Sequence, residues 1–122
     1  MKKTLLIILS VMLFASCGEQ HKAEGIVKQF LNENLVNSEY KAQYGKLGHT
    51  QKINDLKLRS MRQATQQSDK LFKKSVQYGT YQELQQLLFI RTTIIQDKDT
   101  FIRTIYLHPE LHNDGVLAIK EN

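Results

Sequence analysis

The sequence predicts a small α+β domain, in which N-terminal amphipathic helices pack on a C-terminal antiparallel β-sheet. Two observations carry this prediction. Apolar residues recur at helical spacing from Ala23 to Leu35, and two segments rich in β-branched residues follow each other in the last third. A chain of 122 residues with one Pro and no Trp has room for a single domain of this kind.

The first residues have the layout of an export signal. Lys2 and Lys3 are followed by an uncharged, mostly apolar run from Thr4 to Ala15, which is the basic-then-apolar order of a secretory signal. A membrane-spanning helix needs roughly 20 apolar residues, and this run is shorter. We therefore expect residues 1–16 to be a signal peptide that is removed on export.

The segment Leu13-Phe14-Ala15-Ser16-Cys17 resembles the lipobox of bacterial lipoproteins, which places small residues directly before a cysteine. The resemblance implies cleavage between Ser16 and Cys17 and attachment of a diacylglyceryl group to the Cys17 thiol. Further acylation of the new amine, with a fatty acid such as palmitate, usually follows. Phe14 stands where the family most often has Leu. Acyl chains contribute about 0.8 kcal/mol per buried methylene, so two or three chains hold such a protein at the membrane.

The cysteine count agrees with lipidation. Cys17 is the only cysteine, so no internal disulfide can form in an exported chain; a free thiol or an intermolecular disulfide stays open as an alternative. Gly18 stands where an aspartate commonly retains lipoproteins in the inner membrane, which implies the outer membrane if the cell has one. Residues 18–22 lack the run of acidic residues that some lineages use for export to the cell surface, which favours the periplasmic face. We expect residues 17–22 to form the lipidated cysteine and a polar tether, and residues 23–122 to form one domain.

Two helices are predicted in the first part of this domain. The first begins near Lys22 and ends near Asn37-Ser38, and its buried stripe consists of Ala23, Ile26, Val27, Phe30, Leu31 and Leu35. Residues 39–50 contain two glycines and no sustained period, which predicts an irregular connection. A long helix with a polar face is then predicted from about Ile53 to Gln77. Thr80 to Glu83 has the shape of a capping box that opens one or two further turns.

The last third predicts strands. Leu88 to Ile95 and Thr100 to Leu107 are expected to pair as a hairpin, with a turn at Gln96-Asp97-Lys98-Asp99. A second turn at Asn113-Asp114-Gly115 is expected to lead into a short strand from Val116 to Ile119. In the second strand, alternation predicts one shared face for Phe101, Arg103, Ile105 and Leu107.

This order of lipobox, tether, amphipathic helix and terminal strands is similar to that of small cystatin-like or NTF2-like-fold lipoproteins of Bacteroides-type bacteria, which are mostly uncharacterised. The residues that carry the resemblance are Ala23 to Leu31, Phe101 to Leu107 and Val116 to Lys120. The resemblance implies a helix packed on a curved sheet and no established activity. The long helix predicted in the middle departs from that pattern, which has more strand there.

The charge does not indicate a nucleic-acid partner. Lys2 and Lys3 supply two of the five net positive charges and leave with the signal, and Lys73-Lys74 is the only adjacent basic pair after it. Nucleic-acid binding requires a clustered basic face, usually within a recognisable module. A mildly basic surface that attracts acidic lipid headgroups or polysaccharide stays open as an interpretation.

Three residues are candidates for ligand binding. Arg91 and Arg103 lie on the two strands of the predicted hairpin, and we expect them to share a sheet face and to meet an anion there. Tyr106 carries both stacking area and a hydroxyl, which suits a ligand cleft. The ordinary interpretation of such a tyrosine, a core residue at the edge of water, stays open.

No catalytic, metal or cofactor site is predicted. His108-Pro109-Glu110-Leu111-His112 has two histidines four residues apart, but Pro109 disfavours the continuous helix that such a metal site requires, so we interpret these as turn residues. A third ligand, for which His49 is the candidate, would have to arrive by folding. The serines lack the glycine-flanked turn of a nucleophile elbow.

These observations together predict an envelope lipoprotein that acts without catalysis by binding a protein or glycan partner. The alternative is a protein that binds a small ligand in a cavity between the helix of residues 23–35 and the sheet. A hydrolase built in that cavity is a third hypothesis.

Overall fold

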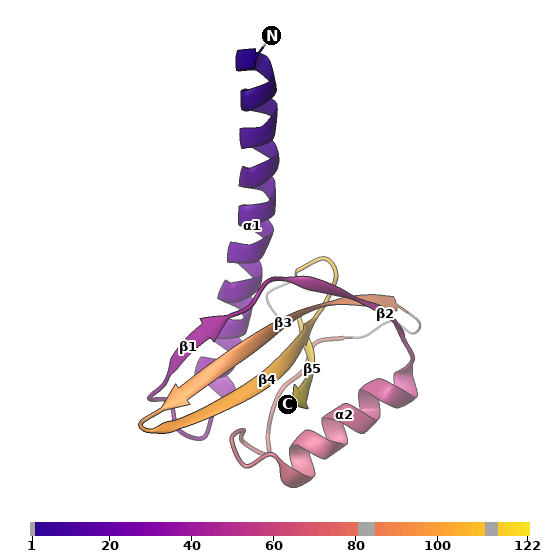
Figure 1. Cartoon of the computed structure of the whole chain (residues 1–122). Helices are drawn as coiled ribbons and strands as arrows, with labels where there is room; N and C mark the ends of the chain where they lie inside the picture. Colours follow the sequence, from indigo (N-terminus) through magenta and orange to yellow (C-terminus); the bar gives the residue numbers. More distant parts are fainter. Residues whose placement is uncertain (1, 81–84, 112–114) are drawn as a thin grey trace.

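The predicted order, in which the helices precede the sheet, holds only in part, because two strands that the sequence did not predict lie between the two helices. The computed structural model describes residues 2–80, 85–111 and 115–122, and within them the side chains from residue 18 onward except that of Gln85. The chain forms two helices and a five-stranded antiparallel sheet, which confirms the α+β class (Figure 1). The elements are α1 (Lys2–Asn34), β1 (Lys41–Tyr44), β2 (Gly48–Ile53), α2 (Asp55–Ser68), β3 (Gln85–Gln96), β4 (Asp99–Leu107) and β5 (Val116–Glu121).

The long strand β3 organises the sheet. Strands β1 and β2 pair with successive parts of one side of β3, β4 pairs with its other side, and β5 pairs with β4. The β3–β4 hairpin is confirmed: Gln96 pairs with Asp99, so Asp97 and Lys98 form the loop. Asp97 has a φ of 53°, a left-handed conformation that aspartate tolerates better than most residues. Strand β5 confirms the predicted final strand and extends it.

The stripe of α1 packs on one face of this sheet, as predicted. All six of its apolar residues from Ala23 to Leu35 are buried, and they join one core cluster with the inward side chains of Leu88, Ile90, Ile94, Ile105 and Leu107. The alternation predicted for β4 is confirmed by the burial of Arg103, Ile105 and Leu107. The first part of α1 projects away from the sheet, whereas its last part lies against it (Figure 1).

The helix predicted over residues 53–77 is too long. Helix α2 begins after Asn54, whose side chain accepts a hydrogen bond from the Lys57 amide at 2.8 Å, and it ends at Ser68. Beyond the helix, Leu71 and Phe72 turn back onto α1, where the Phe72 backbone bridges Leu35. The apolar pattern therefore consists of a short helix and a separate core segment.

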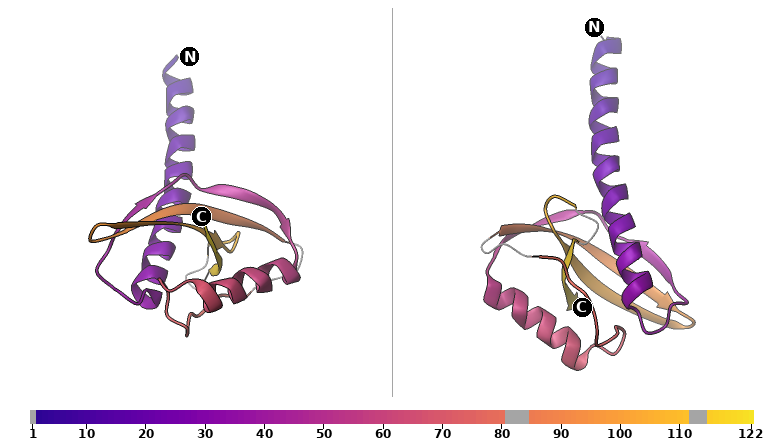
Figure 2. Two further views of the ribbon diagram at one scale, coloured as in Figure 1. Left: turned by 60° about the horizontal axis from the view of Figure 1, so that its bottom comes forward. Right: turned by 180° about the vertical axis from the view of Figure 1, so that it is seen from behind.

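The apolar residues Leu56, Met61 and Ala64 of this segment recur at a spacing that predicts one buried stripe, and this prediction is also wrong. Leu58 and Thr65 are the buried residues of this helix, whereas Leu56 is 78% exposed. The helix lies along the edge strand β5 (Figure 2). Arg62 Nε donates to the Leu117 carbonyl at 2.7 Å, and Thr65 Oγ1 donates to the Ile119 carbonyl at 3.2 Å. Side chains of α2 thus occupy backbone acceptors on the outer side of β5.

The prediction of an irregular connection over residues 39–50 is wrong, because β1 and the first half of β2 lie there. The two glycines allow close approach to β3. A Cβ on Gly48 would lie 2.5 Å from Cζ of Phe89, and a Cβ on Gly45 would lie 3.1 Å from the Arg91 carbonyl oxygen. Glycine in a strand often marks such an approach rather than a break. Tyr81 to Glu83 of the predicted capping box and Asn113-Asp114 of the predicted turn lie outside the described residues.

Replacement of Gly48 by alanine should lower the free energy of unfolding by about 1–3 kcal/mol, because the new methyl group collides with the Phe89 ring. Urea denaturation followed by circular dichroism measures this change. Gly25→Ala is the matched control: Gly25 is exposed within α1 with nothing near its Cβ position. That control should gain about 0.5–1 kcal/mol from better helix propensity. Equal effects of the two substitutions would contradict the close approach.

Candidate functional site

The segment after the predicted lipid attachment point is helical and is hydrogen-bonded to the connection between β1 and β2. Residues 18–22 continue α1, whereas a polar tether was predicted. The Gln20 side chain donates to the Gly45 carbonyl at 2.9 Å and accepts from the Leu47 amide at 2.8 Å. The backbone of Cys17 lies one helical turn before Gln20. These residues are thus part of the folded domain rather than a tether.

Arg91 and Arg103 do not share a sheet face, so that prediction is wrong. In the hairpin register Arg91 lies opposite Thr104, and Arg103 lies opposite Thr92. Residues directly opposite each other in antiparallel strands share a face, so the two arginines point to opposite sides of the sheet. Arg91 is exposed, and Arg103 is 5% exposed.

The Arg103 guanidinium is held by a buried ion pair. Its Nε and Nη2 donate to the two carboxylate oxygens of Asp69 at 2.8 and 3.1 Å, and Nη1 donates to its own strand at the Ile102 carbonyl. A further carboxylate, that of Glu121, lies 3.7 Å from Nη2. Arg103 therefore joins the end of α2 to the sheet instead of meeting an anion from solution. Sequence reasoning missed Asp69, because nothing local links it to a strand 34 residues later.

Tyr106 lies on the same face as Arg91, since Phe89 and Tyr106 are opposite each other in the register. The rings of Phe89 and Tyr106 are 6.5 Å apart between centroids. Burial raises the pKa of the Tyr106 hydroxyl. The tyrosine is half-buried and also packs against the small cluster that contains Leu58 and Leu117, which agrees with a residue at the edge of the core.

The interface between α1 and the sheet is filled. Ile26 is 3% exposed and Phe30 is 6% exposed, and Phe30 contacts the rings of Phe72 and Tyr78. Three hollows lined by described residues lie elsewhere, around α2 and the chain segments beside it.

The hollow between α2 and residues 73–78 is a basic cleft of about 540 Å³. We call it the α2 cleft. Four of its lining residues are cations, namely Arg59, Arg62, Lys73 and Lys74, and no carboxylate is among the described lining residues. The Arg62 guanidinium lies 4.7 Å from the centre of the Tyr78 ring. Of these residues, only the Lys73-Lys74 pair stood out in the sequence.

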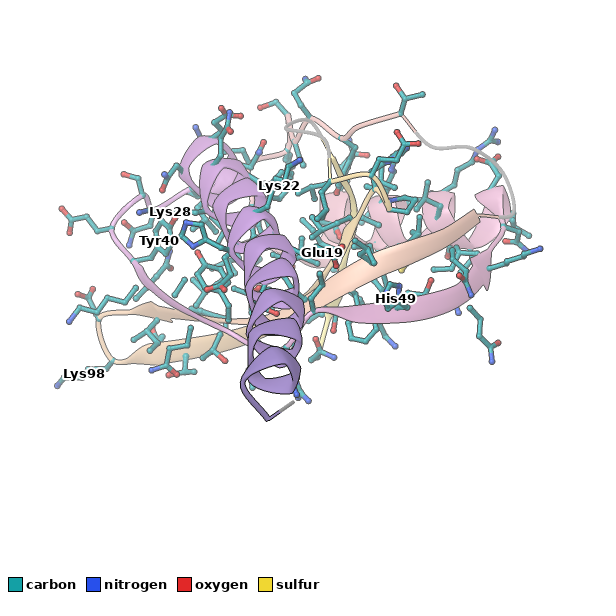
Figure 3. The ribbon with its side chains drawn as sticks, turned by 90° about the horizontal axis from the view of Figure 1, so that it is seen from above. Glu19, Lys22, Lys28, Tyr40, His49 and Lys98 are labelled. Atoms are coloured by element: carbon teal, nitrogen blue, oxygen red, sulfur yellow. The ribbon has the colours of Figure 1, made fainter. Side chains whose placement is uncertain are left out.

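Residues 108–111, the described part of the histidine segment, belong to no group placed to hold a metal ion. His108 Nδ1 accepts a hydrogen bond from the Glu110 amide at 3.1 Å, and His112 lies outside the described residues. Within the described ranges, no group of three or more His, Cys, Asp or Glu side chains is placed to hold a metal ion. His49 lies on β2 and pairs in register with Leu88 (Figure 3).

Comparisons with known proteins do not assign the chain to a family. No family model matches it, and neither a curated protein nor a solved structure does. In the part of the chain that the structure describes, neither helix combines the length and the apolar character of a membrane span.

Replacement of Arg103 by alanine should lower the free energy of unfolding by about 3 kcal/mol or more, because the Asp69 carboxylate is left buried without its partner. Arg59→Ala is the control. It breaks an exposed pair with Asp55 one helical turn away, and it should cost less than about 1 kcal/mol. Chemical denaturation measures the free energy of unfolding of both variants. A similar decrease in the two would mean that the buried ion pair is not needed for stability.

Proposed function

We propose that the chain is a lipoprotein of the bacterial cell envelope, anchored through acylated Cys17 and acting without catalysis as a binding module. The observation that carries the proposal is the sequence Lys2-Lys3, apolar run, Ala15-Ser16-Cys17, in which the only cysteine of the chain follows the signal directly. The proposed location is the periplasmic face of the outer membrane, and the proposed partner is an envelope protein or a glycan.

The fold supports this proposal through the position of Cys17. The first side-chain contacts from α1 to the β1–β2 connection are made by Gln20, three residues after the cysteine. A helix rises about 1.5 Å per residue, so only about 5 Å of helix separates the two positions. An acyl anchor at Cys17 would therefore hold the domain against the bilayer, with the face seen in Figure 3 toward the lipid.

The finer fold assignment is part of the proposal. A single helix packed across one face of an antiparallel sheet agrees with the cystatin-like or NTF2-like arrangement implied by the sequence resemblance. The strands β1 and β2 also supply more sheet in the region where the sequence had suggested helix and connection only.

Replacement of Cys17 by alanine should abolish labelling of the chain with a radioactive or clickable fatty acid, because the thiol that takes the diacylglyceryl group is gone. The variant should remain uncleaved or appear in a soluble fraction. Ser16→Ala is the matched control, since it keeps a small residue at the cleavage position and should be labelled like the natural chain. Continued labelling of the Cys17→Ala chain would contradict the proposal.

A further inference from the structure

The α2 cleft concentrates positive charge that the fold neutralises only in part, through Asp55. Arg59 is the one cation of the four with an ion-pair partner among the described residues, and that pair with Asp55 is 76% exposed on the arginine side. Lys73 Nζ contacts a backbone carbonyl, that of Glu33, at 3.3 Å. Lys74 makes no hydrogen bond or ion pair with the described residues and lies at an exposed turn.

Arg62 shows the imbalance most clearly. Its guanidinium is half-buried and has only neutral partners: the Leu117 carbonyl at 2.7 Å, the Gly79 carbonyl at 3.0 Å and the Tyr78 ring. Burial lowers the pKa of Arg62, and the nearby Tyr78 and Asp55 act in the opposite direction. A cation that loses part of its hydration without gaining a carboxylate leaves a positive potential in the hollow beside it.

The other two hollows around α2 lack this imbalance. The hollow lined by Asp69, Lys70, Arg103 and Glu121 has two carboxylates for two cations, and Arg103 is already paired. The smallest hollow is lined by Asp69, Lys120 and Glu121, which gives an excess of negative charge. Unbalanced positive charge is thus specific to the α2 cleft among these three.

We propose that the α2 cleft binds an anionic group, a phosphate or a carboxylate, held by Arg62, Lys73 and Lys74. The two lysines supply flexible point charges at the rim, and Arg62 supplies charge at the wall. Burial raises the pKa of the Tyr78 hydroxyl, with a hydrogen bond to Thr65 acting against this. The hydroxyl therefore stays protonated at neutral pH and adds no negative charge to the cleft.

The cleft also has a defined orientation relative to the anchor. Helix α2 and the segment after it lie at the end of the domain opposite the projecting part of α1 in all three ribbon views (Figures 1 and 2). An anchor at Cys17 would direct the cleft away from the membrane that holds the protein. This orientation rests on the proposed function, whereas the class of ligand rests on the cleft alone, so the anion would come from the compartment and not from the anchoring bilayer.

Titration of the full-length chain in neutral detergent at low ionic strength tests the proposal, with amide NMR signals as the readout. Pyrophosphate and citrate are the two probes, and they distinguish a phosphate ligand from a carboxylate ligand. We expect at least one of them to shift signals of α2 and of residues 73–78. The double variant Lys73→Gln, Lys74→Gln should raise the Kd several-fold and by up to about 25-fold, since each lost cation weakens a partly exposed ion pair by up to about fivefold.

The matched control is Lys41→Gln, Lys98→Gln, which removes the same charge from two exposed lysines near the tip of the hairpin (Figure 3). It should change the Kd by less than about twofold. Equal weakening in both double variants would overturn the proposal in favour of general attraction to a basic protein, and so would the absence of shifts at the cleft with both probes. Binding of pyrophosphate or citrate to the detergent-solubilised protein does not require acylation. The titration therefore tests the α2 cleft even if the proposed acylation of Cys17 is wrong.

Discussion

The buried ion pair between Asp69 and Arg103 determines how the middle of the chain is arranged. Asp69 is the C-cap of α2, and its carboxylate also accepts from the Leu71 amide at 3.2 Å. The pair thus ends the helix, fixes its end to β4, and starts the turn that places Leu71 and Phe72 on α1. Because the following residues then run back beside α2, the same pair is the reason that the α2 cleft exists.

Sequence patterns predicted the elements whose contacts are local or repetitive. The stripe from Ala23 to Leu35 and the β3–β4 hairpin depend on short-range periodicity and on a turn of two residues, and both are as expected. The end of α2 depends on an ion pair between residues 34 positions apart, so the apolar periodicity alone predicted a helix as far as residue 77. Strands β1 and β2 depend on the close approach of two glycines to Phe89 and Arg91. Glycine has no side chain, so no sequence pattern predicts such a contact.

The candidate site divides in the same way. The proposed lipid site at Cys17 rests on five adjacent residues, because a lipobox is a linear signal. The predicted shared face of Arg91 and Arg103 depended on the strand register, which the sequence does not show. A difference of one residue in register turns a side chain to the other face of a sheet, and Arg103 lies opposite Thr92 rather than Arg91. The cations of the α2 cleft come from a helix and a later turn, and only the fold brings them together.

If copies of the chain share one membrane as proposed, the contacts of Arg62 and Thr65 with β5 have a consequence for how these copies meet. Acylated chains diffuse in two dimensions with a common orientation, so their sheet edges meet far more often than those of a dissolved protein. A bare edge strand offers carbonyls to the amides of a neighbouring copy and can add it as a further strand. Since α2 already occupies the Leu117 and Ile119 carbonyls, the β5 side of one copy is closed to such pairing, and crowded molecules remain separate along that edge.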